Sequence, residues 1–108
     1  MNGPIAASLA LAAATLILPA GANAMDPAAQ RGLTFAQANC SLCHAIGPAG
    51  SSPLPAAPPF RTLSERLPLD TLPQRFATGF VAKHPSMPQF TLDAAQIDDL
   101  MAYIRSIQ

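Results

Sequence analysis

Three features of this 108-residue chain predict an all-α fold. Near the C-terminus, apolar side chains recur at the roughly 3.6-residue period of a helix, from Ile97 to Ile107. Asp26 followed by Pro27 has the chemistry of a second helix start, with a capping carboxylate and a proline in the first turn. No segment shows the residue alternation that predicts a strand. At this length the chain can form one domain at most.

The first 24 residues are predicted to be a secretory signal peptide rather than part of that domain. Residues 5–18 are almost wholly apolar, and Ala22-Asn23-Ala24 matches the small-x-small pattern that signal peptidase reads. Cleavage after Ala24 would leave residues 25–108 as the folded domain, exported to the periplasm. Because residues 1–4 contain no Lys or Arg, an uncleaved membrane anchor is the alternative, although the apolar run is shorter than the roughly 20 residues of a spanning helix.

Two helices are predicted at the ends of the domain. The first covers residues 27–38, and Gly32 within it indicates a packing constraint, because glycine weakens a helix by about 1 kcal/mol relative to alanine. The last begins after Asp93, which can form a capping box with Gln96. The apolar stripe of this last helix consists of Ile97, Leu100, Met101, Ile104 and Ile107.

Shorter helical elements are predicted in the middle of the chain. A helical turn is expected at residues 60–65, followed by a helix at residues 71–78. Asp70 or Thr71 can cap this helix, and Gly79 is suited to end it.

Two segments are predicted to lack regular structure. Residues 47–59 contain five prolines and two glycines, a composition that predicts an ordered loop rather than a helix or strand. Residues 80–91, which include two further prolines, are predicted to be irregular.

Cys40-Ser41-Leu42-Cys43-His44 matches the attachment signature of a c-type haem, C-x-x-C-H. Two thiols at this spacing can form thioether bonds to the two vinyl groups of one haem, and His44 is then placed to ligate the iron from one face. These are the only cysteines and the motif occurs once, so one covalent haem is predicted. A redox dithiol, or a zinc site completed by His44 and His84, stays open as an alternative.

An iron bound by one histidine has a second axial position. Met87 is the leading candidate for it, because Pro85 and Pro88 stiffen its loop and a thioether opposite histidine is a cytochrome ligand pair. His84 is the rival ligand, and an open or displaceable position is a third reading. Met101 lies on the apolar stripe of the last helix and is predicted to be a core residue.

With these residues in place, the chain resembles class I cytochrome c, especially the small bacterial form with one haem. The resemblance covers nearly all of residues 25–108. It rests on five short segments whose order and spacing are specific together: Gly32 eight residues before Cys40, the C-x-x-C-H motif, Ala57-Pro58-Pro59-Phe60, His84-Pro85-Ser86-Met87-Pro88 and Leu100-Met101-Ala102-Tyr103-Ile104.

The resemblance implies a cytochrome c fold, with three main helices and loops around one covalently attached haem. It implies that the first and last helices cross, and that Gly32 lets the Tyr103 ring or the last helix approach. It also implies that a proline carbonyl after the motif, that of Pro58 or Pro59, accepts a hydrogen bond from the second ring nitrogen of His44. Such a bond fixes the tautomer and the orientation of the imidazole.

The function implied is electron transfer by a haem with His44 and Met87 as axial ligands, rather than enzymatic catalysis. The expected partners are redox proteins, such as a dehydrogenase, an oxidase or another cytochrome. With six basic and six acidic side chains and no basic stripe, the chain is not expected to bind nucleic acid, and residues 25–108 are not expected to span a membrane. The alternatives are a tightly bound subunit of a periplasmic dehydrogenase, and a haem sensor or peroxidase with a displaceable sixth ligand.

Overall fold

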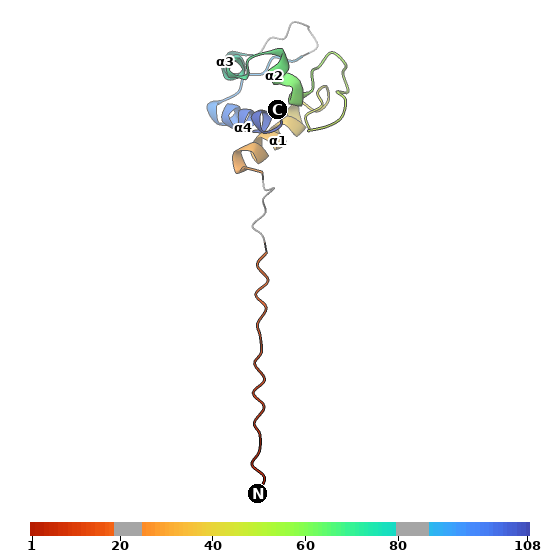
Figure 1. Ribbon diagram of the computed structural model, residues 1–108. Helices are drawn as coiled ribbons and strands as arrows, with labels where there is room; N and C mark the ends of the chain where they lie inside the picture. Colours follow the sequence, from red (N-terminus) through yellow and green to blue (C-terminus); the bar gives the residue numbers. More distant parts are fainter. Residues whose placement is uncertain (19–24, 80–86) are drawn as a thin grey trace.

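The computed structural model describes residues 1–18, 25–79 and 87–108. Within these ranges every regular element is helical, which confirms the predicted all-α class. The α4 helix lies between α1 and α3 (Figure 1). The helices are α1 (Pro27–Asn39), α2 (Leu63–Arg66), α3 (Leu72–Thr78) and α4 (Ala94–Ser106), with 3₁₀ turns at Phe60–Thr62 and Leu69–Thr71.

The central contact of the fold is the crossing of α1 and α4 at Gly32. A Cβ atom built on Gly32 would overlap the backbone carbonyl of Asp99 and would lie 2.8 Å from the Cβ atom of Tyr103. Any side chain at this position would therefore force the two helices apart. The close approach of the last helix to Gly32 agrees with what the resemblance implied.

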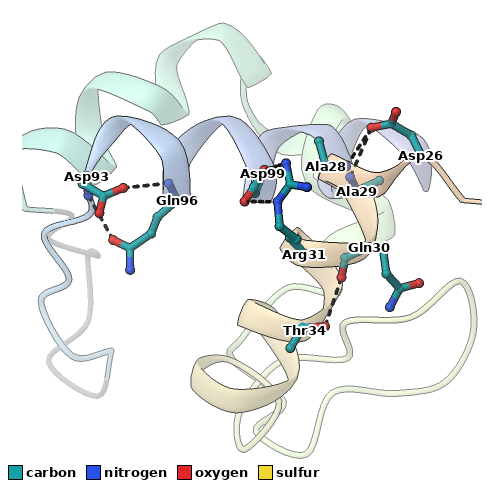
Figure 2. Close-up of polar contacts among 9 residues, drawn as sticks. All are labelled: Asp26, Ala28, Ala29, Gln30, Arg31, Thr34, Asp93, Gln96 and Asp99. Atoms are coloured by element: carbon teal, nitrogen blue, oxygen red, sulfur yellow. Dashed lines mark hydrogen bonds and ion pairs between the residues drawn. The ribbon is translucent and has the colours of Figure 1, made fainter.

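An ion pair lies beside the glycine contact, between α1 and α4 (Figure 2). The Nε and Nη2 atoms of Arg31 each donate to one carboxylate oxygen of Asp99 at 2.9 Å, so the pair is bidentate. The Arg31 side chain is 63 % exposed, and exposed ion pairs contribute little to stability. The pair therefore helps to orient the two helices more than it stabilises the fold.

Both long helices begin at an aspartate, as the sequence predicts (Figure 2). Asp26 Oδ2 accepts hydrogen bonds from the backbone N–H groups of Ala28 and Ala29, at 3.1 and 3.3 Å. Asp93 Oδ1 accepts from the backbone N–H of Gln96 at 2.8 Å, and the Gln96 side chain accepts from the Asp93 N–H at 3.0 Å. These bonds satisfy donors that a helix start leaves without intrahelical partners.

The start of α3 agrees with the prediction in position but lacks the predicted side-chain cap. Thr71 occupies the N-cap position, but its hydroxyl donates to the Pro68 carbonyl at 2.7 Å and makes no capping bond. The Asp70 carboxylate accepts a hydrogen bond from Arg105 at 2.9 Å, so neither predicted side chain caps the helix. The 3₁₀ turn at Leu69–Thr71 explains the difference, because it runs directly into α3 and satisfies the first backbone donor itself.

The other boundaries agree with the prediction to within a residue or two. The α1 helix ends at Asn39, and the turn predicted at residues 60–65 is a 3₁₀ turn that continues into α2. Gly79 ends α3 with a φ of +94°, in the region that glycine adopts without a steric penalty.

The hydrophobic core is built around α4. Tyr103, Leu100 and Ile104 are the largest fully buried side chains, and Met101 is buried with them, as predicted. Ile107 is only partly buried, because α4 ends at Ser106. The other buried members of the core come from α1, from the middle of the chain and from the start of α4: Ala29, Ala36, Phe60, Leu63, Leu72, Phe76, Leu92 and Ile97.

Residues 1–18 are extended and exposed, and none of them belongs to the core cluster. Ile5, for example, is 96 % exposed. The predicted cleavage position after Ala24 lies outside the described residues. In the described ranges, no helix has both the length and the apolar character needed to cross a membrane.

Replacing Gly32 with alanine is expected to destabilise the domain by about 2 kcal/mol or more, because the new methyl group overlaps the Asp99 carbonyl at the helix crossing. Denaturant unfolding of the holoprotein measures this loss. Gln37→Ala, on the exposed face of the same helix, is the control and should change the free energy of unfolding by less than about 0.5 kcal/mol. Equal effects of the two variants would contradict a close crossing at Gly32.

Removing the capping box with Asp93→Ala is expected to cost about 1 kcal/mol of stability, since the Gln96 N–H loses its acceptor. A comparison of the thermal unfolding of Asp93→Ala with that of Asp98→Ala separates the effect of the capping bond from the effect of charge. Both variants remove one carboxylate near the start of α4. If Asp98→Ala lowers the melting temperature as much, the carboxylate acts through its charge alone.

Candidate functional site

The end of α1 positions the two cysteines and the histidine. Cys40 is the first residue beyond α1, and its backbone N–H donates to the Ala36 carbonyl at 2.8 Å, which continues the helical pattern. In the turn that follows, the His44 N–H donates to the Cys40 carbonyl at 3.0 Å. Because this turn grows out of a helix that is held at Gly32, the thiols and the imidazole are positioned by the α1–α4 crossing.

The imidazole of His44 is oriented by one polar and one apolar contact. Its Nδ1 atom lies 2.7 Å from the carbonyl oxygen of Pro58. A carbonyl oxygen can only accept, so Nδ1 carries the proton and Nε2 is left as the nitrogen that can bind a metal. The ring of Phe60 packs against the imidazole, with 5.1 Å between the ring centroids and an interplanar angle of 51°.

The sequence did not decide whether the carbonyl of Pro58 or that of Pro59 contacts His44, and the structure distinguishes the two. The Pro58 carbonyl is the one that reaches His44. The Pro59 carbonyl instead accepts from the backbone N–H of Thr62 at 3.1 Å and from its hydroxyl at 3.0 Å, so it starts the 3₁₀ turn before α2. Pro59 therefore supports the segment that presents Phe60, while Pro58 contacts the imidazole.

The proline-rich loop, residues 47–59, forms hydrogen bonds to the backbone around the motif. The Leu54 N–H donates to the Cys43 carbonyl at 3.1 Å, and the Phe60 N–H donates to the Ala45 carbonyl at 2.9 Å. The hydroxyl oxygen of Ser52 accepts from the Ala45 N–H at 3.0 Å. The loop is thus ordered, as predicted, because its middle and the residue that follows it hydrogen-bond to Cys43 and Ala45.

Tyr103 ties α4 to the same segment. Its hydroxyl donates to the carbonyl of Ile46. Burial raises the pKa of Tyr103, which keeps the hydroxyl protonated as a donor. Sequence reasoning missed the roles of this hydroxyl and of Ser52, because neither residue stands in a local pattern that indicates a partner elsewhere in the chain.

A cavity of about 380 Å³ lies beside the motif. Cys40, Cys43, His44 and Met87 all line it, together with Pro58. The rest of its wall is mostly apolar and includes side chains from all four helices: Phe35, Leu63, Leu72, Phe76, Leu100 and Ile104.

Met87 is the methionine that reaches this cavity. Of the four methionines in the chain, all within the described residues, it alone is part of the lining. Met101 is 4 % exposed in the core, and Met25 is an exposed residue before α1. Met87 is half-buried, and Pro88 beside it also lines the cavity. His84, the rival ligand, lies outside the described residues.

The surroundings of Cys40 favour a neutral sulfur. Burial raises the pKa of this thiol to about 11, so it is protonated near neutral pH. A thioether is neutral and therefore suits these apolar surroundings.

The lining residues fit a haem. A broad apolar ring system requires apolar walls, and the helices supply them. The two thiols line the cavity together with the His44 imidazole, whose Nδ1 faces the Pro58 carbonyl, and the Met87 thioether is on the same lining. Arg75 is the one charged residue in the described lining and can meet an anionic edge group.

Comparison with known proteins agrees with this geometry. Residues 29–108 match the family model described as cytochrome c. No curated protein and no solved structure matches the chain. The matched region starts inside α1 and includes all four helices, the C-x-x-C-H motif and the whole described cavity wall. This chain therefore belongs to the cytochrome c family, whose members transfer electrons through covalently bound haem.

Proposed function

We propose that this cytochrome carries single electrons in the periplasm, with one haem attached to Cys40 and Cys43 and with His44 and Met87 as its axial ligands. The observation that carries the proposal is that these four side chains line one cavity. When bound, haem supplies an iron that alternates between Fe(III) and Fe(II) and so accepts or releases one electron.

His44 is prepared as a ligand before any metal binds. The Pro58 carbonyl holds the proton on Nδ1, which leaves the Nε2 lone pair free and makes that nitrogen a better donor. Phe60 limits rotation of the ring from the side. Little conformational entropy is then lost when the imidazole binds iron.

Met87 would supply a soft, neutral thioether as the second protein ligand of the iron. Thioether ligation opposite histidine raises the reduction potential of a cytochrome c, because it stabilises the reduced iron relative to a second imidazole. Pro88 limits the backbone freedom of the segment that carries Met87.

The apolar wall has a role in the transfer itself. Leu72, Leu100 and Ile104 are buried and line the cavity, so they would exclude water from the part of a bound haem that they contact. Fewer water molecules then reorient when the charge on the iron changes by one. A rigid, dry wall therefore favours rapid electron transfer in both directions.

The proposal is for a carrier rather than an enzyme, because two protein ligands leave no position on the iron for a substrate. Its location outside the cytoplasm rests on the apolar residues 5–18 and on Ala22-Asn23-Ala24. The exposure of residues 1–18, outside the core, supports their removal without damage to the domain.

Expression with c-type haem maturation is expected to yield a periplasmic protein that begins at Met25 and carries the mass of one haem after denaturation. Intact-mass spectrometry measures both properties together. The Cys40→Ala/Cys43→Ala double variant should lose all of the covalent haem, because no other thiol is present. A retained leader would contradict the cleavage site, and a haem-free wild type would contradict the cofactor.

Replacing Met87 with alanine is expected to lower the reduction potential by on the order of 0.1 V, a fraction of the roughly 0.8 V range that axial ligands set. The reduced variant should also bind carbon monoxide at neutral pH, which the wild type should not. Redox titration and optical spectra check both effects. Met101→Leu is the matched control, since Met101 is buried in the core and does not line the cavity.

If Met87→Ala keeps the wild-type potential and spectrum, a different side chain provides the second ligand. If the wild type itself binds carbon monoxide, the sixth position is displaceable and the sensor or peroxidase reading replaces the carrier. Size-exclusion chromatography of native extract separates a free carrier from a tightly bound dehydrogenase subunit.

A further inference from the structure

Gln108, two residues beyond the end of α4, joins three separate backbone groups through one side-chain amide. Its Nε2 atom donates to the carbonyl of Phe60 at 2.8 Å and to that of Ile104 at 2.7 Å. Its Oε1 atom accepts from the backbone N–H of Ser64 at 2.9 Å. Because a carbonyl only accepts and a backbone N–H only donates, a single orientation of the amide satisfies all three partners.

Two of these hydrogen bonds serve helix ends. The α2 helix begins without a side-chain cap from its own segment, and Gln108 accepts from the Ser64 N–H in its first turn. The Ile104 carbonyl lies in the last turn of α4, where carbonyls lack intrahelical donors. A water molecule could satisfy each group singly, whereas one amide also fixes the positions of α2 and α4 relative to each other.

The third hydrogen bond connects the amide to the surroundings of His44 through Phe60. The Phe60 ring packs against the imidazole, with 5.1 Å between the ring centroids, and its N–H donates to the Ala45 carbonyl at 2.9 Å. Two residues earlier in the same segment, the Pro58 carbonyl lies 2.7 Å from Nδ1 of His44. This segment therefore contacts the imidazole twice, and Gln108 fastens it to the end of α4.

We propose that Gln108 is a positioning residue of the electron-transfer site. Its amide holds the segment that carries Phe60 and the Pro58 carbonyl, and in this way it maintains the orientation of His44 and the hydrogen bond from Nδ1. This proposal rests on the electron-carrier function proposed above. It adds a residue that is not part of the described cavity lining and that acts on the site through the backbone of another segment.

The amide affects the reduction potential in a definite direction. The hydrogen bond from Nδ1 to the Pro58 carbonyl makes Nε2 of His44 more basic, and a more basic imidazole stabilises Fe(III) relative to Fe(II). Without Gln108, the segment that carries this carbonyl is less firmly held and the hydrogen bond weakens. The reduced form then becomes more stable relative to the oxidised form, so the intact amide keeps the potential lower.

Gln108→Leu tests the role, because it removes all three hydrogen bonds and adds no charge. NMR of the reduced holoprotein measures how fast the Nδ1 proton of His44 exchanges with solvent, and the variant should exchange about tenfold faster than the wild type. At a potential that leaves the wild type half reduced, the variant should hold about twice as much reduced as oxidised protein. The most protected backbone amides are followed in the same sample, since they report the loss of global stability.

Ser106→Ala is the matched control at the same end of α4. The Ser106 hydroxyl donates to the Tyr103 carbonyl at 2.6 Å, so this hydrogen bond stays within α4 and does not reach the segment that contacts His44. Its loss should change the exchange rate of the Nδ1 proton by less than about twofold.

Two further variants separate the donating half of the amide from the accepting half. Gln108→Lys keeps a donor for the carbonyls of Phe60 and Ile104, whereas Gln108→Glu, a carboxylate at neutral pH, keeps only an acceptor for the Ser64 N–H. Because the hydrogen bond to the Phe60 carbonyl is the one that leads to His44, the Nδ1 proton should exchange more slowly in Gln108→Lys than in Gln108→Glu.

Several results would overturn the positioning role. They are an unchanged Nδ1 exchange rate in Gln108→Leu, an equal acceleration in Ser106→Ala, or faster exchange in Gln108→Lys than in Gln108→Glu. An equal acceleration of the most protected amides in Gln108→Leu would also overturn it, because the residue would then act on global stability alone. Any of these results with a normal one-electron wave in the wild type contradicts only the positioning role, whereas a wild type without that wave contradicts the carrier function on which the role rests.

Discussion

The crossing of α1 and α4 at Gly32 is the constraint on which the rest of the structure depends. The two helices approach so closely that the position of a Cβ atom on Gly32 is already occupied by the Asp99 carbonyl. This contact fixes the position in space of the C-terminal end of α1. The end of α1 in turn fixes the positions of the two thiols and of His44. The same helix pair supplies Leu100 and Ile104 to the cavity wall, so one packing contact positions both the attachment point and the wall.

Hydrogen bonds from the proline-rich loop then orient the side chains of the site, above all the His44 imidazole. The proline-rich composition of the loop does not by itself fix the position of the loop. The loop is instead fastened to the motif through Leu54, Ser52 and Phe60, and its Pro58 carbonyl selects the tautomer of His44. Tyr103 adds a bond from the core of the domain. The loop therefore acts as a support for the imidazole rather than as a linker.

Few fixed charges lie along the described cavity wall. The Cys40 thiol is uncharged near neutral pH, the His44 tautomer is defined by a carbonyl, and Met87 is a thioether. A site with few fixed charges reorganises little when one electron enters or leaves.

Local patterns in the sequence predicted the helices, both aspartate caps of the long helices, the c-type haem motif and the core position of Met101, because each depends on residues a few positions apart. Thr71 is the N-cap residue of α3, as predicted, but its side chain makes no capping bond, because the preceding 3₁₀ turn satisfies the first backbone donor. The choice of Pro58 over Pro59, the bonds of Ser52 and Tyr103, and the meeting of Met87 with His44 on one cavity were decided only by tertiary structure. These contacts join residues from separate segments, and their geometry exists only once α1 and α4 have packed together.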